Sequence, residues 1–176
     1  GTTRLTLTGS KQLVGVGGAQ APALKAGQFN FSIVGNAAED GKPAPMPESA
    51  TATNAQSGAV SFGPITYTME NVFGAEVSAA DESATNGGIE TYTAGRTKVF
   101  TYTLSENRGG EVIDGITYDD SDQIIEVTVT DEGNGKISAA VTDVSDEAKG
   151  NDDFTFVNTY AVTPVDSTPT GDGGLT

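Results

Sequence analysis

Apolar and polar residues alternate with a period of two along most of the chain, and clusters of turn residues separate the alternating segments. This alternation is typical of half-buried β-strands, and the Thr, Val, Ile, Phe and Tyr that dominate these segments suit a pleated surface. The pattern predicts an all-β sandwich or barrel of about 7–9 strands. Its candidate strands are RLTLTG, QFNFSIV, AVSFGPITYTM, KVFTYTLSE, QIIEVTVTD, KISAAVTDV and FTFVNTYAV.

The segments between the candidate strands differ in kind. DEGNGK at 131–136 supplies Asn and Gly for positive φ and predicts a β-hairpin. MENVF at 69–73 predicts one helical turn. Residues 35–58 hold three prolines and residues 78–97 are polar, so both are predicted to be long surface connections, the second with room for a short strand around IETYT.

The domain organisation follows from where the alternation stops. After Tyr160 the chain is rich in Pro, Thr and Gly, which is typical of an interdomain linker or a frayed terminus. The sequence therefore predicts one domain over residues 1–160 and a linker or tail over residues 161–176.

Composition excludes several classes of function. The net charge of −15 and the pI near 4.1 argue against binding to nucleic acid or to anionic membranes. The chain has no cysteine and no histidine, so it offers no disulfide, no thiolate ligand and no Ser-His-Asp triad. The acidic runs DDSD at 119–122 and NDD at 151–153 lack EF-hand spacing and are interpreted as solvated surface rather than a metal site. No cofactor is expected.

Three polar residues interrupt faces that are otherwise apolar: Lys11, Glu106 and Asn158. Side chains alternate strictly along a strand, so each should point into the core with its apolar neighbours, provided that Gly9 introduces no bulge before Lys11. Taken singly, each has a simpler explanation, such as a lysine reaching the rim or a strand ending before Glu106. The apolar neighbours are Leu5, Leu7 and Leu13 for Lys11, Phe100, Tyr102 and Leu104 for Glu106, and Phe154 and Phe156 for Asn158.

If the three meet, their chemistry is complementary. Burial favours the neutral lysine amine and the neutral carboxyl. The Lys11 amine would then be a nucleophile for the amide carbon of Asn158, and protonated Glu106 is expected to hydrogen-bond the amide oxygen and pass a proton to the leaving ammonia. The product is an intramolecular Lys–Asn isopeptide bond; an unreactive polar cluster is the alternative. Lys98 and Asn71 are the best rival lysine and carboxamide.

At these residues the sequence resembles the streptococcal-pilin-type isopeptide-linkage domains of Gram-positive pilins and repetitive surface adhesins. The similar segments run from LTGSKQLVG around Lys11, through VFTYTLSE ending in Glu106, to FTFVNTY with Asn158. The resemblance implies an immunoglobulin-like β-sandwich whose adjacent first and last strands are joined between Lys11 and Asn158, with Glu106 as the catalytic group. The connection at 78–97 is longer than in many members, and no clear sortase-sorting signal is present.

The resemblance implies a structural stalk or spacer module on the bacterial cell surface, outside the cell, rather than a turnover enzyme. Its expected partners are neighbouring domains of the same surface protein, with no nucleic acid or membrane contact and a monomeric state for the isolated domain. The alternative is an adhesin module that binds a host protein or glycan through the connections 35–58 or 78–97.

Overall fold

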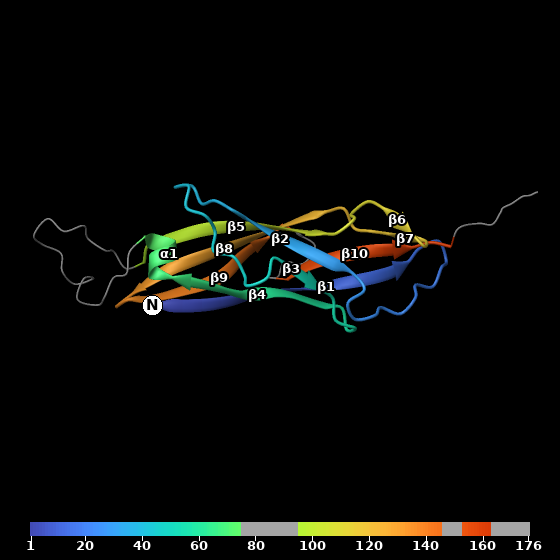
Figure 1. The fold of residues 1–176 in the computed structure, drawn as a ribbon, viewed down its shortest axis with the longest axis horizontal. Helices are drawn as coiled ribbons and strands as arrows, with labels where there is room; N and C mark the ends of the chain where they lie inside the picture. Colours follow the sequence, from blue (N-terminus) through green and yellow to red (C-terminus); the bar gives the residue numbers. More distant parts are fainter. Residues whose placement is uncertain (75–94, 146–152, 163–176) are drawn as a thin grey trace, which may run out of the picture.

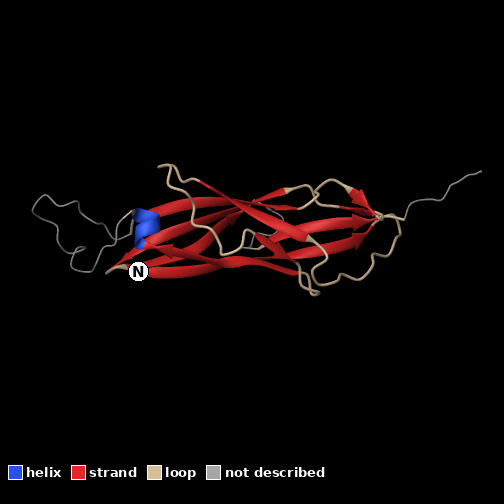
Figure 2. Ribbon diagram, in the orientation of Figure 1, coloured by secondary structure: helices blue, strands red, loops and turns tan. Residues whose placement is uncertain are grey.

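Two five-stranded β-sheets face each other across an apolar core in the computed structural model, which describes residues 1–74, 95–145 and 153–162 (Figures 1 and 2). The first sheet has the order β4 (Ala59–Thr68), β1 (Thr2–Gly15), β10 (Phe154–Tyr160), β7 (Ile116–Thr117), β6 (Val112–Ile113). The second has the order β3 (Thr51–Thr53), β2 (Asn30–Asn36), β5 (Thr97–Glu106), β8 (Asp122–Gly133), β9 (Lys136–Val144). The predicted all-β sandwich is confirmed.

The first and last strands are neighbours and run parallel. Their register places Lys11 opposite Phe156 and Leu13 opposite Asn158. Residues opposite each other on paired strands share a face, so Lys11 and Asn158 lie diagonally adjacent on the inner face of the first sheet. Figure 1 shows β1 starting at one end of the elongated molecule, beside α1, and β10 ending at the other.

β1 keeps the parity that the alternation predicts. Its register with β4 shifts between Leu5 and Leu7, which pair with Ile65 and Phe62. The extra residue of this irregularity lies in β4, so the alternation of β1 is not interrupted. Gly9 introduces no bulge into the pairing with β10, so Lys11 faces inward with Leu7.

The core is lined from both sheets by aromatic and branched side chains. Phe31 of β2 contacts Phe156 of β10 across the sandwich, with ring centroids 5.2 Å apart. Further along the core the hydroxyls of Tyr67 and Tyr102 lie 2.8 Å apart, and that of Tyr102 donates to the Pro45 carbonyl at 2.6 Å. The sequence did not indicate this tyrosine pair.

Several shorter elements complete the fold. α1 (Met69–Phe73) confirms the predicted helical turn, with Thr68 as its N-cap. β3 lies inside the predicted surface connection 35–58, which was therefore only partly right, and β6 and β7 fall between the predicted strands. The segment IETYT lies outside the described residues. In the part of the chain that the structure describes, no helix is long and apolar enough to cross a membrane.

Candidate functional site

Lys11, Glu106 and Asn158 meet in the core near the end of the molecule where β1 and β10 finish. Lys11 and Asn158 come from adjacent strands of the first sheet, and Glu106 is the last residue of β5 in the facing sheet. Their exposed fractions are 2%, 5% and 0% for Lys11, Glu106 and Asn158 respectively. The simpler explanations, a lysine at the rim and a glutamate past its strand, do not hold for the described structure.

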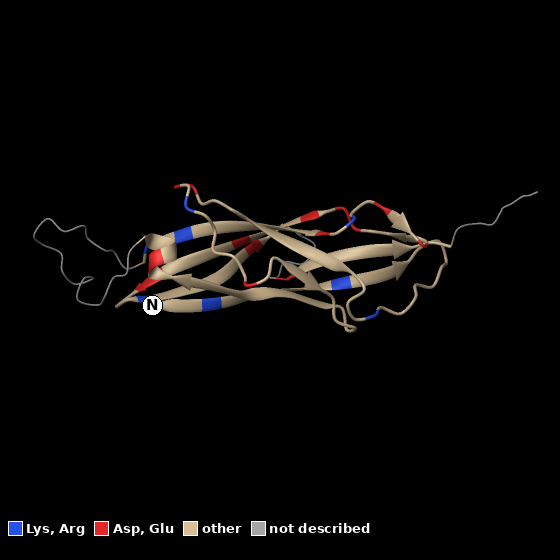
Figure 3. Ribbon diagram, in the orientation of Figure 1, with Lys and Arg blue, Asp and Glu red and all other residues tan. Residues whose placement is uncertain are grey.

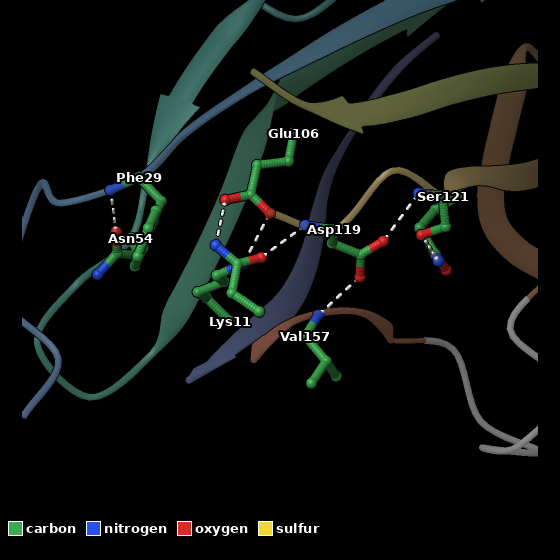
Figure 4. Close-up of polar contacts among 9 residues, drawn as sticks. Lys11, Phe29, Asn54, Glu106, Asp119, Ser121 and Val157 are labelled. Carbon is green, nitrogen blue, oxygen red and sulfur yellow. Dashed lines mark hydrogen bonds and ion pairs between the residues drawn. The ribbon is translucent and has the colours of Figure 1, made fainter. Parts of the chain in front are cut away.

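The Glu106 carboxyl bridges the other two side chains. Its Oε1 lies 2.7 Å from the Lys11 Nζ, and its Oε2 accepts a hydrogen bond of 2.8 Å from the Asn158 Nδ2 (Figure 4). One carboxyl thus contacts both the nitrogen that could attack and the nitrogen that would leave. This is the geometry required of a group that moves a proton between them.

Aromatic rings surround the lysine amine. The Lys11 Nζ lies 4.8 Å from the ring centroid of Phe29 and 5.8 Å from that of Phe31. The Asn54 Oδ1 accepts from the main-chain N–H of Phe29 at 2.8 Å, which holds that residue in place (Figure 4). An apolar wall of this kind keeps water from solvating a charged amine or carboxyl.

Burial shifts both titratable groups toward their neutral forms. Desolvation lowers the pKa of the Lys11 amine, although the hydrogen bond to Glu106 and the charges of Glu106 and Asp119 act in the opposite direction. Desolvation likewise raises the pKa of the Glu106 carboxyl, against the hydrogen bonds from Lys11 and Asn158. Burial thus acts in favour of a neutral amine beside a protonated carboxyl, the state in which the amine has a lone pair for attack.

The Asn158 amide oxygen has a different partner from the one expected. It accepts a hydrogen bond of 2.8 Å from the main-chain N–H of Asp119, while Glu106 contacts the amide nitrogen. A main-chain N–H can donate only to the oxygen of a carboxamide, so this contact fixes the orientation of the Asn158 amide. The prediction that Glu106 bonds the amide oxygen is wrong for this structure.

Asp119 itself was overlooked, because the run DDSD was interpreted as solvated surface. Its side chain is half-buried and accepts from the main-chain N–H of Ser121 at 2.8 Å and of Val157 at 2.7 Å (Figure 4). The aspartate two residues before Ser121 is a turn-forming pattern that sequence can reveal. Its contact with β10, in contrast, depends on the tertiary fold.

The rival residues are engaged elsewhere. Asn71 belongs to the capping box of α1, where its Oδ1 accepts from the main-chain N–H of Thr68 at 2.8 Å. Lys98 pairs with Asp40 near the surface. Figure 3 shows the other Lys and Arg of the described residues as single positions spread along the ribbon. Over residues 1–74, 95–145 and 153–162, no group of three or more acidic side chains is placed to hold a metal ion.

The chain is similar to a known family of domains over most of its length. Residues 7–161 match the model of the family described as FctA, Spy0128-like isopeptide containing domain. Among solved structures, the major pilin from Streptococcus pyogenes is similar at 17% sequence identity with a TM-score of 0.43. That match covers 88% of this chain and 50% of the pilin, so this chain spans about half of the pilin's length. A search of curated proteins finds no match.

Proposed function

The chain belongs to the family of Spy0128-like isopeptide-containing domains, and on that premise we propose that it is a structural module of a Gram-positive surface fibre, cross-linked internally by a bond between Lys11 and Asn158. The observation that carries the proposal is the buried Glu106 carboxyl, which contacts the Lys11 Nζ and the Asn158 Nδ2 at once.

The reaction forms one amide and releases one ammonia. The neutral Lys11 Nζ adds to the Asn158 Cγ, and the electron pair of the C=O bond moves onto Oδ1. Glu106 gives its proton to Nδ2 and receives a proton from the added nitrogen. The bond from Cγ to Nδ2 then breaks, the C=O bond is restored, and Glu106 ends protonated as it began. An amide is a poor electrophile, so the reaction depends on enforced proximity, which can contribute about 7–11 kcal/mol.

Such a bond would suit a load-bearing module outside the cell. It closes a loop of 147 positions (158 − 11) between the first and last strands. By analogy with a long-loop disulfide, its contribution to stability would be about 4–5 kcal/mol in the chain-entropy model. Unlike a disulfide, an amide does not respond to redox conditions, and the chain contains no cysteine.

The test is the intact mass of the purified chain under denaturing conditions. We expect a mass lower than the sequence value by one ammonia, and the full sequence mass for Glu106→Ala. Peptide mapping of the wild-type chain should find Lys11 joined to Asn158. Glu126→Ala, which removes a glutamate from the outward-pointing positions of β8, is the matched control and should leave the cross-link intact.

A wild-type chain of full sequence mass would overturn the proposal, since the three side chains would then form only a polar cluster. A mass deficit that survives Glu106→Ala would instead locate the bond, or its catalyst, elsewhere. Ligand binding through the connections 35–58 or 78–97 stays a prediction, and most of the second connection lies outside the described residues.

A further inference from the structure

The segment after β7 leaves its strand partner in an unusual way. β7 pairs with β10 through Ile116 with Tyr160 and Thr117 with Thr159, and the ladder then ends. Beyond it, the Asp119 carboxylate takes the place of a main-chain acceptor, with Oδ2 accepting from the Val157 N–H at 2.7 Å. The main-chain N–H of Asp119 is thereby free of the ladder and donates to the Asn158 side chain at 2.8 Å.

We propose that Asp119 is a positioning residue for the cross-linking reaction, whose carboxylate holds its own main-chain N–H against the Asn158 Oδ1. This inference rests on the proposed function. Oδ1 is the atom that receives the electron pair when the Lys11 Nζ adds to Cγ. A fixed N–H donor at an oxygen that gains charge is the arrangement of an oxyanion hole, where one donor is worth about 10²–10³ in rate.

The same contact also orients the leaving group. Rotation of the Asn158 amide by half a turn would place its NH₂ against the Asp119 N–H, two donors facing each other. The contact therefore keeps Nδ2 on the side of Glu106, where the hydrogen bond to Oε2 measures 2.8 Å. The proton that Glu106 gives up then reaches the nitrogen that leaves as ammonia, and no further reactant is needed.

A carboxylate is required because two donors converge on Asp119. Oδ1 accepts from the Ser121 N–H at 2.8 Å and Oδ2 from the Val157 N–H at 2.7 Å. An asparagine has one acceptor oxygen and one NH₂ group, so one of the two main-chain donors would face another donor. Asp119→Asn should therefore loosen the segment against β10 with almost no change in volume.

The experiment measures the rate of ammonia loss in the full chain. Chain assembled by chemical ligation and kept in guanidinium is unreacted, because the reaction needs the fold, and dilution into buffer starts it. Samples are quenched in acid at intervals and weighed by intact mass. We expect Asp119→Asn to form the bond at least tenfold more slowly than wild type. The control Asp120→Asn, at the exposed neighbouring carboxylate, should react at the wild-type rate.

A second measurement separates positioning from a general loss of stability. In a Glu106→Gln background, where the bond should not form, the ¹³C resonance of the Asn158 side-chain carbonyl reports the hydrogen bond at Oδ1. Adding Asp119→Asn should shift that resonance, whereas adding Asp131→Asn, a change at a buried carboxylate of β8 that bonds Arg96 and Gly133, should not.

The outcomes are distinct. If wild type and Asp119→Asn lose ammonia at equal rates, the inference is overturned and the cross-link stands. If Asp119→Asn leaves the Asn158 resonance unchanged, the inference is also overturned, even if the variant reacts more slowly. The slower loss of ammonia would then come from lower stability alone. If wild type loses no ammonia, the proposed function fails, and this inference fails with it.

Discussion

A lysine amine and a glutamate carboxyl in an apolar core are costly to fold unless their charges are paired or removed. In this protein, burial lowers the pKa of Lys11 and raises that of Glu106, and the two side chains lie 2.7 Å apart. The state that is least costly to bury is therefore also the reactive one. Folding itself would create the nucleophile, which explains how an unactivated lysine could react once and only in the native state.

The pH dependence of bond formation follows from these two shifts. The reaction needs Lys11 without its extra proton and Glu106 with its proton, so the rate should pass through a maximum as the pH rises, and the step that belongs to Lys11 should lie below its ordinary pKa of 10.5, because that pKa is lowered. The step that belongs to Glu106 should lie above its ordinary value, because burial raises the pKa of the carboxyl that must donate a proton. Refolding into buffers of stepped pH, followed by intact mass, measures this bell-shaped profile. A rate that climbs steadily up to 10.5 would contradict the desolvation of Lys11.

For single residues, the alternation of the sequence predicted that three side chains point into the core, but it did not predict which hydrogen bonds they make. Lys11, Glu106 and Asn158 could be found because a period of two assigns each residue to a face. The orientation of the Asn158 amide could not, since it depends on a main-chain N–H of Asp119 from a segment 39 positions away. A sequence shows which side chain stands at each position. Nearly every residue has a main-chain N–H, however, so only the fold shows which of these groups contacts Asn158.

Among the strands, the close approach of β1 to β10 depends on Gly9. A Cβ built there would lie 2.3 Å from the Phe154 carbonyl oxygen and 2.4 Å from its ring. Contacts this short force the two strands apart, because backbone atoms cannot move aside as the end of a flexible side chain can. Gly9 lies two residues before Lys11 on the same strand, so a displacement there would reach the site.

Gly9→Ala should destabilise the protein by about 1–3 kcal/mol, the usual cost of overpacking a core. It should also slow ammonia loss, because the Lys11 Nζ would be moved from the Asn158 Cγ. Urea unfolding and intact mass measure the two effects. Gln12→Ala, at an exposed position of the same strand, is the control and should change neither. Wild-type stability in Gly9→Ala would show that β1 and β10 can separate without cost.

The connection that follows β2 is tied to the core by the tyrosine pair. Burial raises the pKa of Tyr67 from 10.0 to about 12 and raises that of Tyr102 further. The unfolded chain releases these protons near 10.0 while the folded chain retains them, so folding stability should fall as the pH rises from 10 to 12. Urea unfolding across this range should show a shallower decline for the double variant Tyr67→Phe with Tyr102→Phe. An equal decline would mean that other groups cause it.

The long strands were predictable, and the short ones were not. The seven segments with clear alternation all contain strands of the structure, since each has enough residues to express a period of two. β3, β6 and β7 have three, two and two residues. Elements this short show no period: β3 and β7 are defined by pairing with the longer strands β2 and β10, and β6 by pairing with β7. α1 was predicted despite its length, and its capping box of Thr68 and Asn71, which the structure shows, depends on local residue types.

Across the whole molecule, the parallel pairing of β1 with β10 decides how tension would act. Tension on the two termini would pull β1 from one end of the molecule and β10 from the other (Figure 1). All the hydrogen bonds between parallel strands would then be loaded together in shear. A bond from Lys11 to Asn158 would carry the load past the 146 residues that lie between them, 12–157, so only residues 1–11 and the residues from Asn158 onward would lie in its path.

Single-molecule stretching of the full chain between handles at its ends tests this. The cross-linked wild type should show no unfolding step that includes residues 12–157, because the bond prevents this loop from extending. Glu106→Ala should unfold in a long step that includes the stretch from Lys11 to Asn158, whose 147 Cα–Cα steps (158 − 11) have a contour length of about 500 Å at roughly 3.3–3.6 Å each. Glu126→Ala should behave as wild type. A full-length unfolding step in wild-type molecules whose mass shows the lost ammonia would place the bond outside the path of the force, contrary to the parallel pairing of the terminal strands.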